Sequence, residues 1–407
     1  MRVSIFTQFF PPEMEPSGFM FESLSEYLGG RKEVQDIQVV SGFPNFPKGE
    51  FINKDWLSVF KSKKINNYTL NNVLVIPSNN NNNFKRILNY TSYLFFAVLK
   101  GLLMKKSDVL IATSPPIFVG LAGLIVSKIK GSKFVLDVRD IWPESAVQMG
   151  TLKNKFIISF LEMLERLLYN NASLITVATP GMIEIIKTKT KKNVRVEYIP
   201  CGVNIPNLEN KKEKFSNPFL QFEEKKFFVL YAGLHGFAQN LTTIIDAANL
   251  LKENKNISFY FIGDGPDKNR IKNYTEKLAL RNVTFFDPLP RDEIRKFFKY
   301  TDCAIVPLRD LEIFKNVFPS KTFELMSYGV PTIVGVGGEI EKIINSTSSG
   351  ISVKPDNATE YAKAILKYAQ DKQFTLNVKE NAIYTARKYF DYKVTNKRFL
   401  ELFKDLK

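Results

Sequence analysis

The sequence predicts an α/β protein with two doubly wound domains in tandem. Short apolar runs alternate with amphipathic helical stretches over residues 109–199, and the alternation begins again at Phe227. Such alternation indicates parallel sheets covered by helices on both faces. The chain has 407 residues, more than one hydrophobic core usually serves, which also favours two domains.

We expect the first domain at 1–200 and the second at 227–385, joined by a linker over 201–226. Prolines, a glycine and a long polar run mark this linker. The stretch 358–407 is helical by pattern, without an intervening strand. We therefore expect its last part, 386–407, to leave the second sheet and pack back on the first domain.

In the first domain, the apolar patterns predict strands and helices in order. The polar tract 79–83 is expected to be a surface loop. Strands are predicted at 3–6, 37–40, 109–112, 134–138, 174–178 and 194–199, and helices at 18–28, 84–104, 117–130, 154–169 and 182–188.

The second domain follows the same logic. Its Ser320 resembles an N-cap, and Gly329 and Pro331 are helix stop signals. Strands are predicted at 227–232, 257–262, 283–286, 303–306 and 332–336. Helices are predicted at 241–251, 267–278 and 291–300, and from Ser320 to the stop signal at Gly329.

Composition limits the classes of function. Two cysteines and a single histidine argue against a disulfide framework, a histidine-rich metal site or a Ser-His-Asp triad. A net charge of +16 calls for an acidic partner: membrane lipid, nucleic acid or a phosphorylated substrate. The short apolar start reads as a strand rather than a signal peptide, so we expect a cytoplasmic protein.

The helix predicted at 84–104 is the most apolar part of the first half. Its uncharged core is too short to span a bilayer. Lys85, Arg86 and Lys100 flank or interrupt it, and Phe95 and Phe96 lie near its centre. This pattern fits a helix lying on anionic lipid, and a buried core helix fits it equally well.

The helix beginning at Ser320 is suited to hold an anion. Lys321 lies in its first turn, where the helix dipole disfavours a cation unless a bound phosphate reverses the sign. Glu324, one turn on, could accept hydrogen bonds from ribose hydroxyls. A solvated lysine–glutamate pair at i,i+3 is the plainer alternative.

Glycine-rich loops follow two strands of the same domain. Gly233, His235 and Gly236 follow the first strand, and Gly265 follows the next. With Lys321 they gather at the carboxyl edge of one sheet, which favours a nucleotide-diphosphate site. His235 could hydrogen-bond a substrate or be structural.

An acidic loop follows the strand 134–138 in the first domain. Asp137, Arg139, Asp140 and Glu144 could supply a base and a clamp for an anion, or a salt-bridge network that holds the loop. Gly18 begins the first helix, where it permits close approach of a ligand or simply forms a turn.

With these motifs in view, the chain resembles the family 4 retaining glycosyltransferases of the GT-B fold. It is most similar to their WbuB-like subgroup, which includes N-acetylfucosaminyl transferases of bacterial surface-polysaccharide assembly. The resemblance is carried by the segments Phe134–Gly150, Tyr198–Val203, Tyr231–Asn240, Phe261–Gly265, Asn282–Phe285 and Phe318–Pro331.

The resemblance implies two Rossmann-like domains that face each other across a cleft. It also implies transfer of a sugar from a UDP donor, with retention, to a lipid-linked or glycan acceptor in O-antigen or capsule synthesis. An N-acetylated deoxy-amino sugar is one candidate for the transferred group. The enzyme would need no metal or other cofactor, bind no nucleic acid, and work on the inner face of the cytoplasmic membrane.

The resemblance also implies residue roles in the second domain. Lys321 would meet the diphosphate and Glu324 the ribose, and the base would lie near Pro288 and Leu289. The first-domain pair Arg139-Asp140 matches a His-Asp pair near the reacting sugar in many members. We therefore expect Asp140, Arg139 and Lys321 to be catalytic, with Gly18, Asp137 and Glu144 on the acceptor side and Gly233, His235, Gly236, Gly265, Pro288, Leu289, Ser320 and Glu324 at the donor.

Two departures stand out. Asn316 occupies the position of the first glutamate in the pair that the family often shows, and Glu312 is four residues away. Gln239 and Asn240 stand where a basic residue is usual.

Two other classes of function remain open. A UDP-sugar 2-epimerase of the same fold would want more acid–base groups than a chain with one histidine offers. A non-catalytic basic binding protein would explain the charge, but no basic run interleaved with aromatic residues supports it.

Overall fold

The structure, a computed structural model, describes the whole chain except residues 14, 47, 53–57, 79–82, 192 and 207–225. Most of the predicted linker and all but Asn83 of the predicted polar loop therefore lie outside the described residues. The described chain divides into two compact units, Met1–Gly202 with Tyr392–Lys407, and Val203–Asp391.

Within its described residues, the first unit has an eight-stranded sheet in the order β3-β4-β2-β1-β5-β6-β7-β8. All neighbours pair in parallel except β3 and β4. The strands are β1 (Arg2–Phe6), β2 (Asp36–Gly42), β3 (Phe60–Ile65), β4 (Tyr68–Val73), β5 (Val109–Ser114), β6 (Lys133–Val138), β7 (Leu174–Val177) and β8 (Val196–Tyr198).

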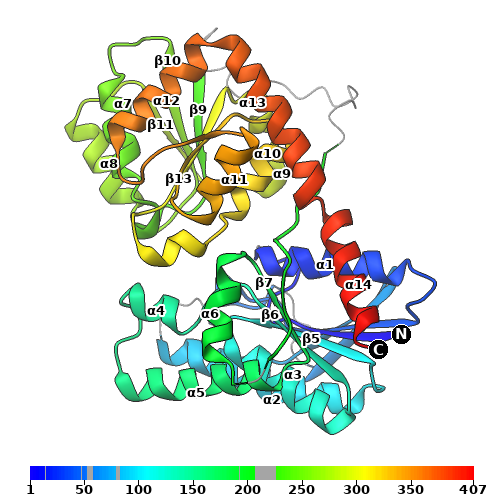
Figure 1. The fold of residues 1–407 in the computed structure, drawn as a ribbon. Helices are drawn as coiled ribbons and strands as arrows, with labels where there is room; N and C mark the ends of the chain where they lie inside the picture. The colour runs from blue at the N-terminus through cyan, green and yellow to red at the C-terminus, as the bar shows by residue number, and fades with distance from the viewer. Residues whose placement is uncertain (14, 47, 53–57, 79–82, 192, 207–225) are drawn as a thin grey trace. The chain divides into compact units, whose positions relative to one another are not determined.

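Helices cover both faces of this sheet, as the sequence predicts (Figure 1). On β1, Val3 and Ile5 pack with α1 and α14, while Phe6 packs with α2, α3 and α5. The helices of this unit are α1 (Pro16–Gly29), α2 (Asn83–Leu103), α3 (Ile117–Lys130), α4 (Glu144–Gln148), α5 (Lys155–Asn171), α6 (Gly181–Lys189) and α14 (Tyr392–Asp405).

The β3–β4 hairpin was not predicted, because its strands are too polar to show a buried pattern. Lys61, Lys63 and Lys64 make β3 a charged edge strand, a common protection against edge-to-edge pairing. Asn66 turns the hairpin in a left-handed conformation, with φ of 45°.

The second unit, as described, has a six-stranded parallel sheet in the order β11-β10-β9-β12-β13-β14. Side chains alternate along β9: Val229 and Tyr231 pack with α7, α8 and α12, and Leu230 with α9 and α10. The elements are β9 (Phe227–Ala232), β10 (Ile257–Ile262), β11 (Val283–Phe286), β12 (Cys303–Pro307), β13 (Thr332–Gly335), β14 (Ile351–Ser352), α7 (Thr242–Leu250), α8 (Lys268–Lys277), α9 (Arg291–Phe298), α10 (Ser320–Ser327), α11 (Glu339–Thr347), α12 (Ala358–Gln370) and α13 (Lys372–Thr385), with short helical turns at Phe237–Gln239, Glu312–Asn316 and Ala386–Phe390.

The predicted return of the C-terminal helix to the first unit is confirmed, because α14 packs against α1. Its predicted start at residue 386 is wrong, since the chain returns at Tyr392. Ala386 and Phe390 are still buried in the core of the second unit, where Phe390 stacks on Phe323 with ring centroids 3.8 Å apart.

Candidate active site

The carboxyl edge of the second sheet brings Gly233 and Lys321 together. Gly233 follows β9 with φ of 149°, and a Cβ added there would lie 1.8 Å from the Lys321 Nζ. The backbone conformation favours glycine at this position, and a Cβ there would displace the ammonium.

The Lys321 ammonium is held with little compensation. It lies 4.9 Å from the centroid of the Tyr231 ring, and among the described residues it has no hydrogen-bond or ion-pair partner. Burial lowers its pKa to about 8, against a smaller opposing effect of Glu324. A bound anion would stabilise a partly desolvated cation of this kind in the first turn of a helix.

The start of α10 differs from the prediction in one respect. Pro319 is the N-cap residue and Ser320 is already the first helical residue, without a capping hydrogen bond from a side chain. The predicted N-cap role of Ser320 is therefore wrong. The helix N-terminus next to Lys321 is not occupied by a side chain of its own cap.

Glu324 forms ion pairs that the sequence did not predict. Its Oε1 accepts hydrogen bonds from the Nε atoms of Arg291, at 2.9 Å, and Arg295, at 3.1 Å. The Glu324 side chain is 15% exposed. The signal was present in the sequence, because two arginines four residues apart begin the helix that follows β11 and so face the same sheet edge.

The two glycine loops pack on each other through their backbones. A Cβ added at Gly263, which has φ of 143°, would lie 1.9 Å from the Gly233 carbonyl oxygen. The His235 amide donates to the Asp264 carbonyl at 2.8 Å, and Gly265 lies against the His235 backbone. Part of the glycine content of these loops thus serves their mutual packing.

His235 is enclosed rather than presented to a ligand. Its side chain is fully buried among Tyr231, Phe261 and Phe285, and neither ring nitrogen has a hydrogen-bond partner among the described residues. Burial lowers the pKa of His235 to about 4, so the ring is neutral at pH 7. The expected contact of this side chain with the donor is contradicted by its burial.

The remaining predicted donor residues lie around the same edge. Gly236 is buried just before the turn Phe237–Gln239, and Pro288 is exposed while Leu289 packs on the core beside α9. Lys268, which was not predicted, ties the ends of β10 and β11 by donating to the carbonyls of Gly263, at 2.8 Å, and Phe286, at 3.2 Å.

Asn240, at one departure from the family pattern, and Glu312, four residues from the other, have partners of their own. The Asn240 side chain donates to Asp356 at 2.7 Å and to Thr243 at 3.1 Å. Glu312 pairs with Lys315.

In the first unit, Asp137 and Arg139 hold each other. The Arg139 Nε donates to Asp137 Oδ2 at 2.6 Å, Thr176 donates to Asp137 Oδ1 at 2.6 Å, and Arg139 also donates to the Ile199 carbonyl at 3.0 Å. The Asp137 side chain is fully buried. The salt-bridge alternative is the one observed, and the expected acceptor contact of Asp137 is contradicted.

Glu144 is also paired, since its carboxylate lies 3.1 Å from the Lys189 ammonium. Asp140 is partly exposed, and burial raises its pKa. Of the acids in this loop, Asp140 alone has no ion-pair partner among the described residues, which leaves it as the candidate for substrate contact.

Gly18 has a partner for its amide. Glu15 is the N-cap of α1, and its carboxylate accepts from the Gly18 N–H at 3.1 Å. The Gly18 amide is thus satisfied within the chain, and the approach of a ligand to this helix start stays a prediction. Glu13, also missed by sequence analysis, is buried and accepts from the amides of Asn45 and Phe46, each at 2.9 Å.

Comparison with known proteins gives this site a context. Residues 212–388 match the family model "Glycosyl transferases group 1". This region of the chain is therefore similar to the group 1 glycosyltransferases. The model covers the glycine loops, Lys321 and Glu324.

Curated glycosyltransferases are similar to a larger part of the chain. WbjE of Pseudomonas aeruginosa, a probable glycosyltransferase, is 27% identical over 272 residues, which cover 64% of this chain and 66% of WbjE, just under two thirds. WcaI of Escherichia coli (strain K12), whose name assigns it to colanic acid biosynthesis, is 20% identical over 342 residues, 82% of this chain and 83% of WcaI.

Solved structures show the same fold over the full length. Sucrose-phosphate synthase from Thermosynechococcus elongatus aligns with a TM-score of 0.77 at 13% identity, covering 100% of this chain and 99% of that one. Anabaena HepE in complex with UDP and glucose aligns with a TM-score of 0.71 at 16% identity, covering 100% of both chains. The predicted GT-B fold, with two Rossmann-like domains, is confirmed.

The described residues were compared with the requirements of a metal-binding cluster and of a membrane-spanning helix. They contain no group of three or more His, Cys, Asp or Glu side chains placed to hold a metal ion. In the same part of the chain, no helix is both long and apolar enough to cross a membrane.

Proposed function

We propose that this protein is a retaining glycosyltransferase that transfers a sugar from a UDP donor to a lipid-linked or glycan acceptor in bacterial surface-polysaccharide synthesis. The observation that carries the proposal is Lys321, a poorly compensated ammonium beside Gly233 in the first turn of α10. A diphosphate there would supply the missing negative charge.

Lys321 would then act on the leaving group. When the bond between sugar and diphosphate breaks, negative charge grows on the phosphate oxygens. An ammonium and a helix N-terminus that are already in place stabilise this charge without reorganising. We propose no covalent protein nucleophile and no metal, so the diphosphate itself is available to take the acceptor's proton.

Glu324 would bind the ribose in this arrangement. The hydrogen bonds from the Nε atoms of Arg291 and Arg295 both use its Oε1. Its second oxygen can accept from ribose hydroxyls, while the two arginines hold the carboxylate in a fixed orientation.

Asp140 is the residue of the first unit that we propose for contact with sugar or acceptor hydroxyls. Its carboxylate has no ion-pair partner in the described part of the chain, whereas those of Asp137 and Glu144 are paired. Arg139 then serves the site by holding the loop through Asp137.

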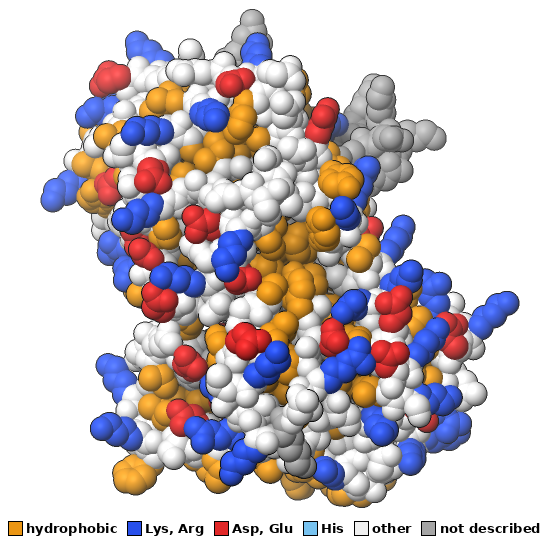
Figure 2. Space-filling view, in the orientation of Figure 1, with side chains coloured by type: hydrophobic (Ala, Val, Ile, Leu, Met, Phe, Trp, Pro, Cys, Tyr) orange, Lys and Arg blue, Asp and Glu red, His pale blue; other side chains and the backbone are white. Residues whose placement is uncertain are grey.

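The names of similar proteins support the donor and the pathway. HepE was solved with UDP and with UDP-glucose, and the name of WcaI refers to colanic acid biosynthesis. We extend the proposal to the WbuB-like subgroup and to work at the inner face of the cytoplasmic membrane. The net charge of +16 and the Lys and Arg side chains spread over the surface in Figure 2 suit an anionic membrane.

The membrane-facing residues proposed on α2 are not equally placed. Phe95 is exposed, whereas Phe96 packs on the core and against Phe60, which corrects its expected contact with lipid.

The test is a calorimetric titration of the purified protein with UDP, ADP and GDP, first without metal and then with Mg²⁺. We expect metal-independent binding of UDP and its loss in Lys321→Met. The matched control is Lys342→Met, an exposed lysine of the same unit that pairs with Glu339. The proposal fails if no nucleoside diphosphate binds, or if both variants bind UDP as the wild type does.

A further inference from the structure

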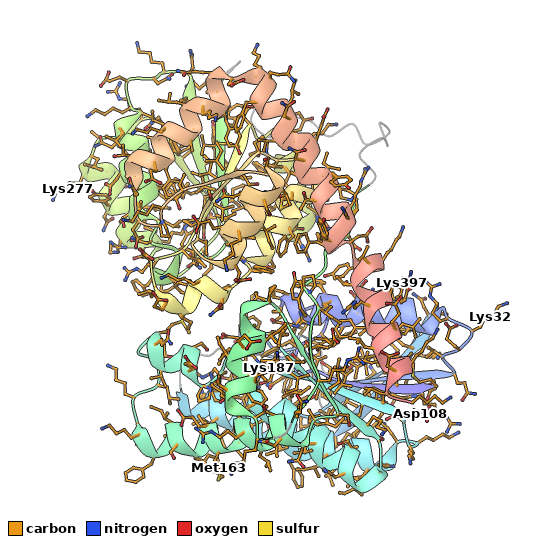
Figure 3. The ribbon with its side chains drawn as sticks, viewed as in Figure 1. Lys32, Asp108, Met163, Lys187, Lys277 and Lys397 are labelled. Atoms are coloured by element: carbon orange, nitrogen blue, oxygen red, sulfur yellow. The ribbon has the colours of Figure 1, made fainter. Side chains whose placement is uncertain are left out.

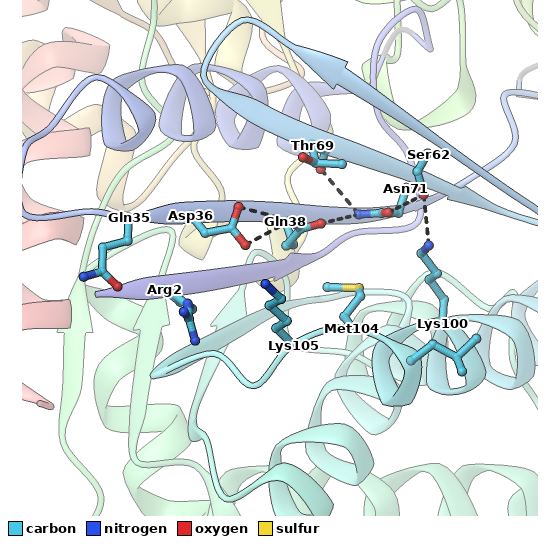
Figure 4. A pocket seen from close by; sticks show the side chains of 11 residues that line it. Arg2, Gln35, Asp36, Gln38, Ser62, Thr69, Asn71, Lys100, Met104 and Lys105 are labelled. Atoms are coloured by element: carbon cyan, nitrogen blue, oxygen red, sulfur yellow. Dashed lines mark hydrogen bonds between the residues drawn. The ribbon is translucent and has the colours of Figure 1, made fainter.

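A groove of about 780 Å³ lies on the first unit, near the amino ends of its parallel strands. It is formed between the first residues of β1, β2 and β4 and the C-terminal end of α2 (Figure 4). We call it the amino-edge groove. Its lining includes Arg2, Asp36, Gln38, Asn71, Lys100 and Lys105.

One wall of the amino-edge groove is a continuous chain of hydrogen bonds. Lys100 donates to Ser62 Oγ at 2.9 Å, Ser62 donates to Asn71 Oδ1 at 2.7 Å, and the Asn71 amide donates to Gln38 Oε1 at 3.0 Å. Gln38 in turn donates to both Asp36 oxygens, at 3.1 and 3.0 Å. These hydrogen bonds order the side chains of the wall, and Gln38 satisfies the Asp36 carboxylate.

Arg2 and Lys105 also line the groove, and Arg2 lies beside Asp36 as its register partner on the neighbouring strand. Within the described part of the chain, neither the Arg2 nor the Lys105 side chain has an ion-pair partner. The nearby Asp108, labelled in Figure 3, accepts from the Arg2 backbone N–H at 2.8 Å. An incoming anion is the ligand that these two cations fit.

Apolar side chains stand beside these cations. Phe95, Leu99 and Leu103 recur every four residues on the outer side of α2, with 59%, 39% and 75% of their surface exposed. The edge strand β3 adds Lys63 and Lys64, both exposed. Exposed apolar residues next to clustered cations are typical of a surface that docks on anionic lipid.

We propose that the amino-edge groove binds the phosphate of an anionic lipid headgroup, with Leu99 and Leu103 entering the acyl layer beside it. The residue of this apolar face that lines the groove is the aliphatic Leu103, which favours lipid, because single-stranded nucleic acids are held by aromatic stacking platforms. This inference deepens the proposed membrane association and moves its centre from Lys85 and Arg86 to the other end of α2.

The experiment is co-sedimentation of the full-length protein with vesicles of phosphatidylcholine, with and without phosphatidylglycerol, over a range of salt. We expect binding to anionic vesicles that weakens with salt. The double variant Arg2→Glu/Lys105→Glu should bind them roughly tenfold or more weakly. Leu99→Ser/Leu103→Ser should also lose binding, but equally at low and high salt.

The matched control is Phe156→Ser/Phe160→Ser on α5, where both rings are exposed, at 89% and 51%. These residues lie on the same side of that helix as Met163, which Figure 3 shows away from the sheet. We expect this variant to bind vesicles as the wild type does. Loss of binding in it alone, wild-type binding by the groove variants, or failure of the wild type to bind would overturn the proposal.

Two further readouts distinguish lipid from nucleic acid, and the groove from the UDP site. Tighter binding of single-stranded DNA than of vesicles, lost in Arg2→Glu/Lys105→Glu, would assign the groove to nucleic acid and overturn the lipid proposal. UDP affinity, measured on every variant, should stay unchanged, because the groove belongs to the first unit and Lys321 to the second. Vesicle binding without UDP binding would sink the proposed function and leave this inference standing.

Discussion

Replacing Lys321 by methionine should raise the free energy of unfolding of the unliganded protein. The same change should lower its affinity for UDP. Methionine keeps most of the side-chain volume beside Tyr231 and removes the charge. Burial lowers the Lys321 pKa from 10.5 to about 8, which corresponds to about 3 kcal/mol against the charged form at ~1.4 kcal/mol for each pKa unit. We take this as an upper bound, because the side chain retains some exposure.

The pH dependence gives the prediction its sign. The pKa of Lys321 is lower in the folded than in the unfolded state, so between pH 8 and 10.5 the unfolded state binds more protons. Wild-type stability therefore gains from this group as pH rises through that window, and the full penalty is present below it. The stability advantage of Lys321→Met should be largest at pH 7 and vanish near pH 10.5.

Two assays check this prediction. Urea denaturation at pH 7 and at pH 10 gives the free energies of unfolding of wild type, Lys321→Met and the control Lys342→Met. Titration calorimetry should show UDP bound roughly 10- to 100-fold more weakly by Lys321→Met, as expected for a lost charged hydrogen bond. Destabilisation at pH 7 by more than about 1 kcal/mol, on the scale of one net hydrogen bond, would refute the reasoning.

Three other predictions concern single carboxylates. Glu324→Gln should weaken UDP roughly tenfold while hardly affecting 2′-deoxy-UDP, if the carboxylate binds the 2′-hydroxyl; equal losses in calorimetry would argue against that contact. Asp140→Asn should lower kcat/KM for UDP release roughly 10- to 100-fold without changing UDP affinity; unaltered turnover would remove Asp140 from the site. Burial raises the pKa of Glu13 to about 7. The free energy of unfolding of the wild type should therefore fall by up to about 3 kcal/mol as pH rises from 4.5 to 7. Urea denaturation should show no such fall in Glu13→Gln. An identical pH profile for both proteins would contradict the buried, protonated state of Glu13.

The sequence determined the architecture and one edge of the site. Alternating apolar and amphipathic stretches can be satisfied by parallel sheets covered on both faces, so the two units and most element positions followed from periodicity. Because carboxyl ends of parallel strands meet at one edge, the loop at Gly233 and the helix start at Lys321 could be placed together before their contact was known.

The tertiary structure decided which side chains remain free to act. Arg291 and Arg295 pair with Glu324 across 33 and 29 residues of sequence, Asp137 turns inward to Arg139, and His235 is closed off by rings from three strands or their ends. Local pattern reports whether a residue is polar or apolar. The partners of a polar residue depend on the order of the strands and on which side chains lie close enough to form ion pairs with it. Both are determined only when segments distant in the sequence pack together.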